Sequence, residues 1–434
     1  MIACAGIFFA ACSSGSNNSE EDILLVSTIP DHNEIISPAT EFMSFTFDRG
    51  IYIVDKNKIT LNNHQAADVS VYGTTLKVIS GPLAYGTDYV LTIEKGAIKD
   101  GSNNLNKAPF SLHFSTENEP EITADLVMPN ASVQTKKVYR FLLDNYEKNV
   151  ISGAMAKVSW NTDEADRVYR WTGKYPALNC FDFIHHHYSP ANWINYDNTD
   201  VVENWWDNRG LVAAMWHWNV PKSSGSGDRA FYTSETSFDV SQAVQEGTAE
   251  NLQIMQDMDI IAGYLLALQN KNIPVIWRPL HEAAGRWFWW GAKGAEPCKK
   301  LWIIMFDYFK SKGLNNLIWV WTAEKDDDDW YPGDDYVDMI GRDVYNMNSS
   351  SGMATEYKNL KQRFPNKIIA LSECGNVATM SNQWSALALW SWFMPWYDYD
   401  ATDTSAHQHG GKEFWENAFN CNYVITREQM PSLK

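Results

Sequence analysis

From about residue 122 onward, short apolar runs alternate with longer amphipathic stretches, and this alternation constrains the fold more than any other feature. Strands separated by helices favour a parallel sheet, because a parallel connection needs a crossover. Roughly 310 residues suit one closed (β/α)8 barrel. The eight apolar runs are Val150–Gly153, Ala177–Phe183, Leu211–Trp216, Pro274–Trp277, Leu317–Trp321, Val337–Ile340, Ile368–Leu371 and Leu389–Met394.

Helices are expected between these runs, among them 249–270 and 298–311. Spacings of three and four residues place apolar side chains on one face of a helix. In the first of these helices, one buried stripe is predicted to hold Leu252, Met255, Met258, Ala262 and Leu265.

Residues 23–118 have a different character and predict a separate all-β domain. Short β-rich runs recur here between turns that contain Gly, Asn and Pro, a spacing typical of an antiparallel sandwich. Tyr85-Gly-Thr-Asp-Tyr-Val-Leu-Thr-Ile93 and the closing Phe114-Ser-Thr116 resemble segments of bacterial Ig-like domains. All twenty tryptophans lie between Trp160 and Trp415, so a spacer role is favoured for residues 23–118, with glycan binding as the alternative.

Residues 1–22 resemble a bacterial lipoprotein signal followed by a polar tether, with Cys12 as the lipidated residue. The apolar run is too short to span a bilayer, and no Lys or Arg precedes it, which departs from the usual signal pattern. The resemblance implies a lipoprotein of the outer membrane or cell surface, held to the membrane only at Cys12. A periplasmic or secreted protein is the alternative.

Charge and metal-ligand patterns exclude several classes. The formal net charge of -18 argues against a nucleic-acid partner. Cys180, Cys298, Cys374 and Cys421 form no C-x-x-C pair, which predicts neither a zinc site nor a disulfide framework. If extended, His185–His187 would point to opposite faces and could scarcely bind one ion. Residues Asp326–Asp335 offer carboxylates for Ca²⁺, but a solvated loop is preferred. No metal and no cofactor are therefore expected.

Glu282 is the first candidate catalytic residue. It follows the apolar run Pro274–Leu280, and Trp287, Phe288, Trp289 and Trp290 come within eight positions. Aromatic rings desolvate a carboxylate and raise its pKa, which is what a proton donor at neutral pH needs. The alternative is a structural ion pair with Arg278, surrounded by core tryptophans.

Glu373 is the second candidate, at the end of the run that begins at Lys367. Two carboxylic acids at the ends of two strands are what a retaining glycosidase requires, with the carboxyl groups about 5 to 5.5 Å apart. Alone, Glu373 could equally be a helix N-terminal carboxylate or an ion-pair partner.

Arg-Pro-Leu-His-Glu282, the following Trp287-Phe-Trp-Trp-Gly291 and the later Leu371-Ser-Glu-Cys-Gly375 resemble glycoside hydrolase family 26, the β-mannanases and their relatives. The resemblance covers residues 122–434. It implies a (β/α)8 barrel with Glu282 as acid/base and Glu373 as nucleophile. The further residues that it implies in the sugar site are His217, His281, Trp287, Tyr345 and Trp396.

The sequence therefore predicts an Ig-like β-sandwich followed by a barrel that hydrolyses β-1,4-mannan with retention, without a cofactor. One alternative is a lichenase or xylanase of the same family. Another is a surface glycan-binding lipoprotein without activity, although a pure binder has no need of two catalytic carboxylates.

Overall fold

The computed structural model describes residues 22–434 except 67, 80–82, 158, 226 and 399–406, and it divides into two compact units, Met1–Pro120 and Glu121–Lys434. The proposed signal and its Cys12 lie outside the described residues. No helix among the described residues is both long and apolar enough to cross a bilayer.

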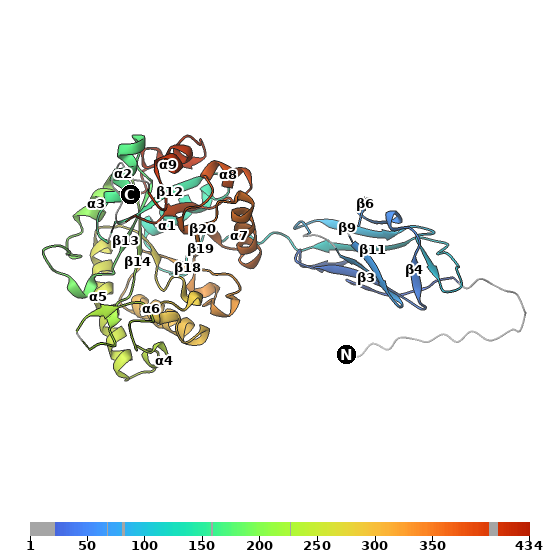
Figure 1. Ribbon diagram of the computed structural model, residues 1–434, viewed down its shortest axis with the longest axis horizontal. Helices are drawn as coiled ribbons and strands as arrows, with labels where there is room; N and C mark the ends of the chain where they lie inside the picture. The colour runs from blue at the N-terminus through green and yellow to red at the C-terminus, as the bar shows by residue number, and fades with distance from the viewer. Residues whose placement is uncertain (1–21, 67, 80–82, 158, 226, 399–406) are drawn as a thin grey trace, which may run out of the picture. The chain divides into compact units, whose positions relative to one another are not determined.

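The N-terminal unit consists of mainly antiparallel sheets around a core of its own (Figure 1). One sheet has the order β1-β3-β8-β7, from Leu25–Ile29, Phe42–Phe47, Thr75–Ile79 and Asp68–Tyr72. The other has the order β2-β11-β9-β5-β6, from Glu34–Ile36, Phe110–Thr116, Asp88–Ile93, Ile59–Leu61 and His64–Gln65. β4 (Ile51–Ile53) and β10 (Ile98–Asp100) form a separate pair. One strand pair, β11 with β2, is parallel.

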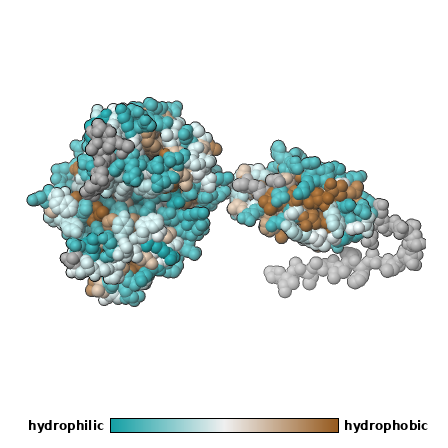
Figure 2. Space-filling view, in the orientation of Figure 1, coloured by the Kyte–Doolittle hydropathy of each residue, from teal (hydrophilic) through white to brown (hydrophobic). Residues whose placement is uncertain are grey.

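The surface of this unit carries apolar side chains, and Figure 2 shows an apolar area on its visible face. Tyr52 and Tyr72 are exposed by 59% and 73%. The unit has no tryptophan, so tyrosines are the largest aromatic groups that it presents to solvent.

The C-terminal unit is a closed barrel of eight parallel strands, as predicted. The strands in order are β12 (Val150–Met155), β13 (Leu178–Asp182), β14 (Leu211–Met215), β17 (Val275–Arg278), β18 (Leu317–Thr322), β19 (Met339–Tyr345), β20 (Ile368–Gly375) and β21 (Trp392–Pro395). Closure comes from β12, which pairs with both β13 and β21. The short β22 (Val424–Ile425) adds to β12 outside the ring.

Helices surround the strands (Figure 1). They are α1 (Val133–Asn145), α2 (Asp163–Thr172), α3 (Asp200–Asp207), α4 (Val240–Ala243), α5 (Ala249–Asn270), α6 (Ala295–Ser311), α7 (Ser350–Arg363), α8 (Met380–Ser385) and α9 (Lys412–Phe419). Between β18 and β19 the connection has only the 3-10 turns Asp328–Trp330 and Asp334–Tyr336, so this βα unit departs from the regular pattern.

The predicted helices agree with α5 and α6, but the predicted stripe on α5 is wrong at one end. Met258, Ala262 and Leu265 are buried, whereas Leu252 is 64% exposed. Leu252 lies in the first turn, where the buried face of the helix is occupied by Asn251 and Ile254. The side-chain amide of Asn251 donates a hydrogen bond to the carbonyl of Ala243 in α4. The face of α5 that packs on α4 therefore carries Asn251, and Leu252 lies outside that face.

Fourteen of the twenty tryptophans are buried in the core of the barrel unit, where large aromatics contribute much of the packing. Ten are fully buried: Trp205, Trp216, Trp218, Trp277, Trp289, Trp290, Trp302, Trp319, Trp321 and Trp390. The four described cysteines, Cys180, Cys298, Cys374 and Cys421, are free thiols, in line with the prediction of no disulfide framework.

Candidate active site

Strand β17 delivers Glu282 to the C-terminal end of the barrel through a tight, strained turn. Leu280 and Glu282 have φ of 48° and 51°, in the left-handed region that residues with a side chain rarely adopt. Such conformations persist only where the surroundings enforce them, and they gather at functional sites. The turn places Glu282 beyond the C-terminal end of the strand, directly before the 3-10 turn Ala283–Gly285.

The glycines of the Trp-rich segment allow this turn to pack. A Cβ added at Gly291 would lie 1.9 Å from the carbonyl oxygen of Ala283. One added at Gly285 would lie 2.0 Å from the Trp287 ring. The segment after Glu282 can therefore fold back onto the turn only with glycine at these positions.

Burial and the neighbouring carboxylates favour the protonated form of Glu282. Trp287 Nε1 donates a hydrogen bond of 3.0 Å to Glu282 Oε2. Burial, with the nearby charges of Asp343 and Glu373, raises the pKa of Glu282 to about 9. The alternative in which Glu282 pairs with Arg278 is wrong, because the Arg278 guanidinium binds Asp343 and Glu373 instead.

Glu373 lies near the end of β20, buried, and is held by a cation and a hydroxyl. Arg278 Nη2 donates to its Oε2 at 2.6 Å, and the Tyr345 hydroxyl donates to its Oε1 at 2.5 Å. Burial and the nearby Asp343 carboxylate raise the pKa of Glu373, and the guanidinium and hydroxyl oppose that rise. Of the two acids, Glu373 is therefore the one whose charged form is held by a cation.

One carboxylate oxygen each of Glu282, Asp343 and Glu373 lies within 4.8 Å of the others. This spacing fits the pair of a retaining glycosidase, at about 5 to 5.5 Å, and is shorter than the roughly 6.5 to 9.5 Å of an inverting one. The ladder between β19 and β20 shifts register at Gly341/Asp343, which aims Asp343 and Glu373 at the same point.

Sequence reasoning missed Arg278 and Asp343. Arg278 Nη1 donates to Asp343 Oδ2 at 2.8 Å, and Ser372 Oγ donates to Asp343 Oδ1 at 2.7 Å. The sequence did contain a signal for this ion pair. Arg278 ends an otherwise apolar strand, and a guanidinium that is buried there needs carboxylates as partners. Asp343, in the run Gly-Arg-Asp-Val-Tyr345, was the available partner.

His217, His281 and Trp396 gather beside the acids. The rings of His217 and His281 lie 4.6 Å apart, and those of His217 and Trp396 lie 5.7 Å apart. Burial and the neighbouring His217 lower the pKa of His281 well below its usual value, so this ring is neutral at pH 7. Its Nδ1 is buried and has no hydrogen-bond partner among the described residues.

A third missed residue, Asp182 at the end of β13, orients His217. Its Oδ2 accepts from His217 Nδ1 at 2.6 Å, and its Oδ1 accepts from the His217 backbone N–H at 3.0 Å. The contact fixes the proton on Nδ1, so that Nε2 is the ring atom free to face a ligand. No sequence signal distinguished Asp182 from other strand-end acids.

The structure thus brings all seven predicted site residues to the C-terminal ends of the strands. Glu282 and Glu373 contact Trp287 and Tyr345, which remain 44% and 37% exposed. His281 adjoins Glu282 and contacts His217, which contacts Trp396. The buried Glu373, the partly buried Glu282, half-exposed aromatics and a neutral imidazole lie together at this end of the barrel.

His186 and His187 begin the 3-10 turn His186–Tyr188, with His185 directly before it, so the segment is not extended as assumed from sequence. His186 and His187 both face the buried Asp257, at 3.7 and 3.6 Å, while His185 packs on Trp193. Trp216 Nε1 donates to His186 Nδ1, so the nitrogen of His186 that faces Asp257 carries the proton. A metal-binding ring would instead donate from its other nitrogen. His187 Nε2 contacts the carbonyl of Asn219 at 2.9 Å, and Asp257 accepts from Trp218 Nε1 at 2.8 Å.

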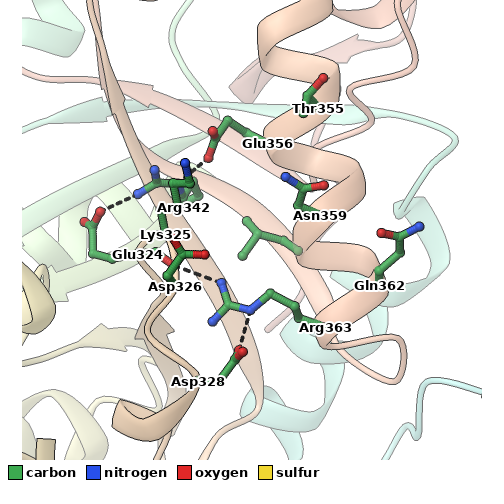
Figure 3. A pocket seen from close by; sticks show the side chains of 11 residues that line it. Glu324, Lys325, Asp326, Asp328, Arg342, Thr355, Glu356, Asn359, Gln362 and Arg363 are labelled. Atoms are coloured by element: carbon green, nitrogen blue, oxygen red, sulfur yellow. Dashed lines mark hydrogen bonds and ion pairs between the residues drawn. The ribbon is translucent and has the colours of Figure 1, made fainter. Parts of the chain in front are cut away.

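The acidic loop after β18 is paired with cations rather than simply solvated. Arg363 binds Asp327 and Asp328 at 2.5 and 2.6 Å. Beside α7, a cavity of about 400 Å³ holds Arg342 between Glu324 and Glu356, as Figure 3 shows. Among the described residues, the groups that could hold a metal ion do not include this loop.

A (β/α)8 barrel that presents one protonated and one cation-held carboxylic acid at its C-terminal face has the parts of a glycoside hydrolase of the two-carboxylate type. The chain belongs to glycosyl hydrolase family 26: residues 127–429 match that family, and residues 20–116 match the bacterial Ig-like domain. The resemblances of residues 122–434 to glycoside hydrolase family 26 and of residues 23–118 to bacterial Ig-like domains are thereby confirmed.

Curated relatives and solved structures agree with this membership. Mannan endo-1,4-beta-mannosidase B of Piromyces sp is 33% identical over 87% of this chain, and the enzyme of Thermothelomyces thermophilus is 35% identical over 72%. The chain spans only 66% and 64% of the lengths of these two relatives.

Two solved structures are similar. The GH26 domain of an endo-beta-mannanase/endo-beta-glucanase from Prevotella bryantii has 41% identity and a TM-score of 0.66, covering 71% of this chain and 99% of that one. A beta-mannanase from a symbiotic protist of the termite Reticulitermes speratus, complexed with gluco-manno-oligosaccharide, has 38% identity and a TM-score of 0.65, covering 73% of this chain and 100% of that one.

Proposed function

We propose that the protein is an endo-β-1,4-mannanase that cleaves its substrate with retention of configuration. The observation that carries the mechanism is the separation of the two glutamates, with oxygens within 4.8 Å. A water molecule that attacks directly from the opposite face needs a wider gap. The short gap supports a covalent intermediate on one of the two acids.

In this proposal Glu373 is the nucleophile, and Glu282 acts first as the acid and then as the base. The Glu373 carboxylate attacks the anomeric carbon, and the C–O bond to the leaving sugar breaks as Glu282 gives its proton to the leaving oxygen. Glu282, now ionised, takes a proton from water, and that water displaces Glu373 from the sugar. Arg278 and Tyr345 hold Glu373 in place through both of its oxygens, so that its charged form is oriented for attack.

Mannan is the proposed substrate because the relatives with 33% to 35% identity are mannan endo-1,4-beta-mannosidases. Exposed aromatics support a long sugar chain as the ligand, since rings stack on the apolar faces of pyranoses. Five of them follow the ends of barrel strands, at Tyr188, Trp193, Tyr232, Trp287 and Tyr345. β-Glucan is the second candidate, because the Prevotella relative is named for both activities.

The test is a product profile on mannan, galactomannan, lichenan and xylan, with proton NMR of the first products. We expect kcat/KM to be highest on a mannan, with β-configured products at early times. A kcat/KM on lichenan or xylan equal to that on mannan would overturn the substrate. An initial α-product would overturn double displacement.

We also propose, from the sequence alone, that Cys12 is lipidated and holds the enzyme at a bacterial membrane. Growth with labelled palmitate should label the wild-type chain and leave Cys12→Ser unlabelled. Equal labelling of both would remove this residue as the anchor.

A further inference from the structure

His409 lies between β21 and α9, outside the seven predicted site residues, and its ring reaches the hydrogen-bond donor of the proposed nucleophile. The imidazole contacts the Tyr345 ring edge to face, with centroids 5.7 Å apart and an interplanar angle of 83°. The Tyr345 hydroxyl in turn donates to Glu373 Oε1. One side chain therefore separates His409 from the carboxylate that is proposed to attack the sugar.

The two rings meet beside Gly375, two positions after Glu373. A Cβ added at Gly375 would lie 2.5 Å from His409 Cδ2 and 2.7 Å from Tyr345 Cδ1. Gly375 is the partner of Tyr345 in the ladder between β19 and β20. Because residue 375 has no side chain, the His409 ring can pack over the backbone of β20 and touch the Tyr345 ring.

Hydrogen bonds to the backbone hold His409 at this place. Its Nδ1 lies 3.1 Å from the carbonyl oxygen of Tyr397, which can only accept, so the ring proton is on Nδ1. Its own carbonyl accepts from the Asn376 N–H at 3.0 Å. Its N–H donates to His407 Nδ1 at 3.2 Å. His409 thereby joins the segment that follows β20 to the segment that follows β21.

Tyr345 needs support from outside its own strand. It ends β19, and 37% of its surface is exposed, so core packing encloses the side chain only in part. Edge-to-face packing favours one orientation of a ring. Burial lowers the pKa of His409 below its ordinary value, so the ring is neutral at pH 7 and acts on Tyr345 by contact.

We infer that His409 is a positioning residue for the nucleophile, because its ring holds Tyr345 in the orientation that donates to Glu373. This inference rests on the proposed function, in which Glu373 attacks the anomeric carbon. A misplacement of about 1 Å near the reacting atoms can lower a rate by about 100-fold. Loss of the His409 ring should therefore lower kcat and change KM little.

A double-mutant cycle tests whether His409 acts through Tyr345. His409→Ala should lower kcat on galactomannan by roughly tenfold, with KM changed by less than about twofold. In a Tyr345→Phe protein, which lacks the hydroxyl, His409→Ala should cause almost no further loss. His409→Asn keeps a donor for the Tyr397 carbonyl but lacks the ring, so it should lose kcat with the loop still held.

Two more variants complete the set. His409→Phe keeps a ring against Tyr345 and should recover part of the activity that His409→Ala loses. Gln408→Ala changes the exposed neighbour of His409 and should leave kcat and KM at the wild-type values.

Three kinetic outcomes would overturn the inference. The first is an equal loss from His409→Ala in the wild-type and Tyr345→Phe backgrounds. The second is a raised KM with unchanged kcat, which would mark a sugar contact instead. The third is a His409→Phe protein as slow as His409→Ala. The same cycle on lichenan separates this claim from the substrate: coupling seen on lichenan, with no turnover of galactomannan, would overturn mannan and support the positioning role.

Crystal structures of the wild-type and His409→Ala proteins give a check that needs no turnover. In His409→Ala alone, we expect the Tyr345 hydroxyl to move more than about 3.5 Å from Glu373 Oε1, or to occupy two orientations. A Tyr345 hydroxyl that still donates to Glu373 from one orientation in His409→Ala would overturn the inference, whichever polysaccharide the enzyme cleaves.

Discussion

At the scale of single residues, the account assigns Glu282 and Glu373 different tasks, and their substitutions should differ accordingly. Glu373→Ala should lower kcat on mannan by about 10³-fold or more, as expected when a nucleophile is lost. Glu282→Ala should lose as much on mannan but far less on an aryl mannoside, whose activated leaving group needs no proton. Equal losses of the Glu282→Ala protein on both substrates would contradict its role as the acid.

The pH dependence should report the proton on Glu282. Catalysis needs Glu282 protonated, so kcat/KM should fall as pH rises through its pKa of about 9. The neighbouring Asp343 carboxylate raises that pKa, and Asp343→Asn should therefore move the high-pH limb to lower pH. The exposed Asp335→Asn serves as the control and should leave the limb in place. A limb that stays fixed in Asp343→Asn, or moves upward, would argue against the assignment.

The sequence identifies those site residues whose neighbours in the chain form a recognisable pattern. Glu282 stands before a run of four aromatics, and Glu373 ends an apolar strand. Arg278, Asp343 and Asp182 act through partners that are remote in sequence, at separations of 65 residues for Arg278 with Asp343 and 35 for Asp182 with His217. Such partners become visible only when the strands are side by side.

At the scale of elements, the turn after β17 depends on glycine at position 291. Gly291→Ala should lower the free energy of unfolding by about 2 kcal/mol or displace the turn, because the new Cβ meets the backbone of Ala283. Gly263→Ala on α5 meets nothing within 4 Å and should stabilise the protein by about 0.5 to 1 kcal/mol. Thermal unfolding and kcat/KM check both. A Gly291→Ala protein with wild-type stability and activity would show that the turn tolerates a side chain.

The strands were predicted correctly where the apolar runs are continuous. The predicted strands end too early where polar site residues interrupt the apolar run. β19 runs to Tyr345 and β20 to Gly375, beyond the predicted ends at Ile340 and Leu371. The added residues include Asp343 and Glu373, which are buried polar groups facing the site. Apolar periodicity cannot detect such positions, since their burial is stabilised by ion pairs and hydrogen bonds.

At the scale of the whole molecule, each of the two units has its own hydrophobic core. Calorimetry of the full chain should therefore show two unfolding transitions. A chain of residues 121–434 should fold alone and hydrolyse soluble galactomannan with the kcat/KM of the full chain, because all seven proposed site residues lie within it. An insoluble or inactive fragment would show that the Ig-like unit is needed by the barrel.

The central claim is that Glu373 becomes covalently bound to the sugar while Glu282 moves the proton. It is tested most directly by mass spectrometry of peptides from enzyme treated with a 2-deoxy-2-fluoro mannosyl fluoride, a reagent that forms the intermediate quickly and loses it slowly. The account predicts a single glycosyl adduct on Glu373, with none in the Glu373→Ala protein. An adduct on Glu282, or inactivation without any covalent adduct, would contradict it.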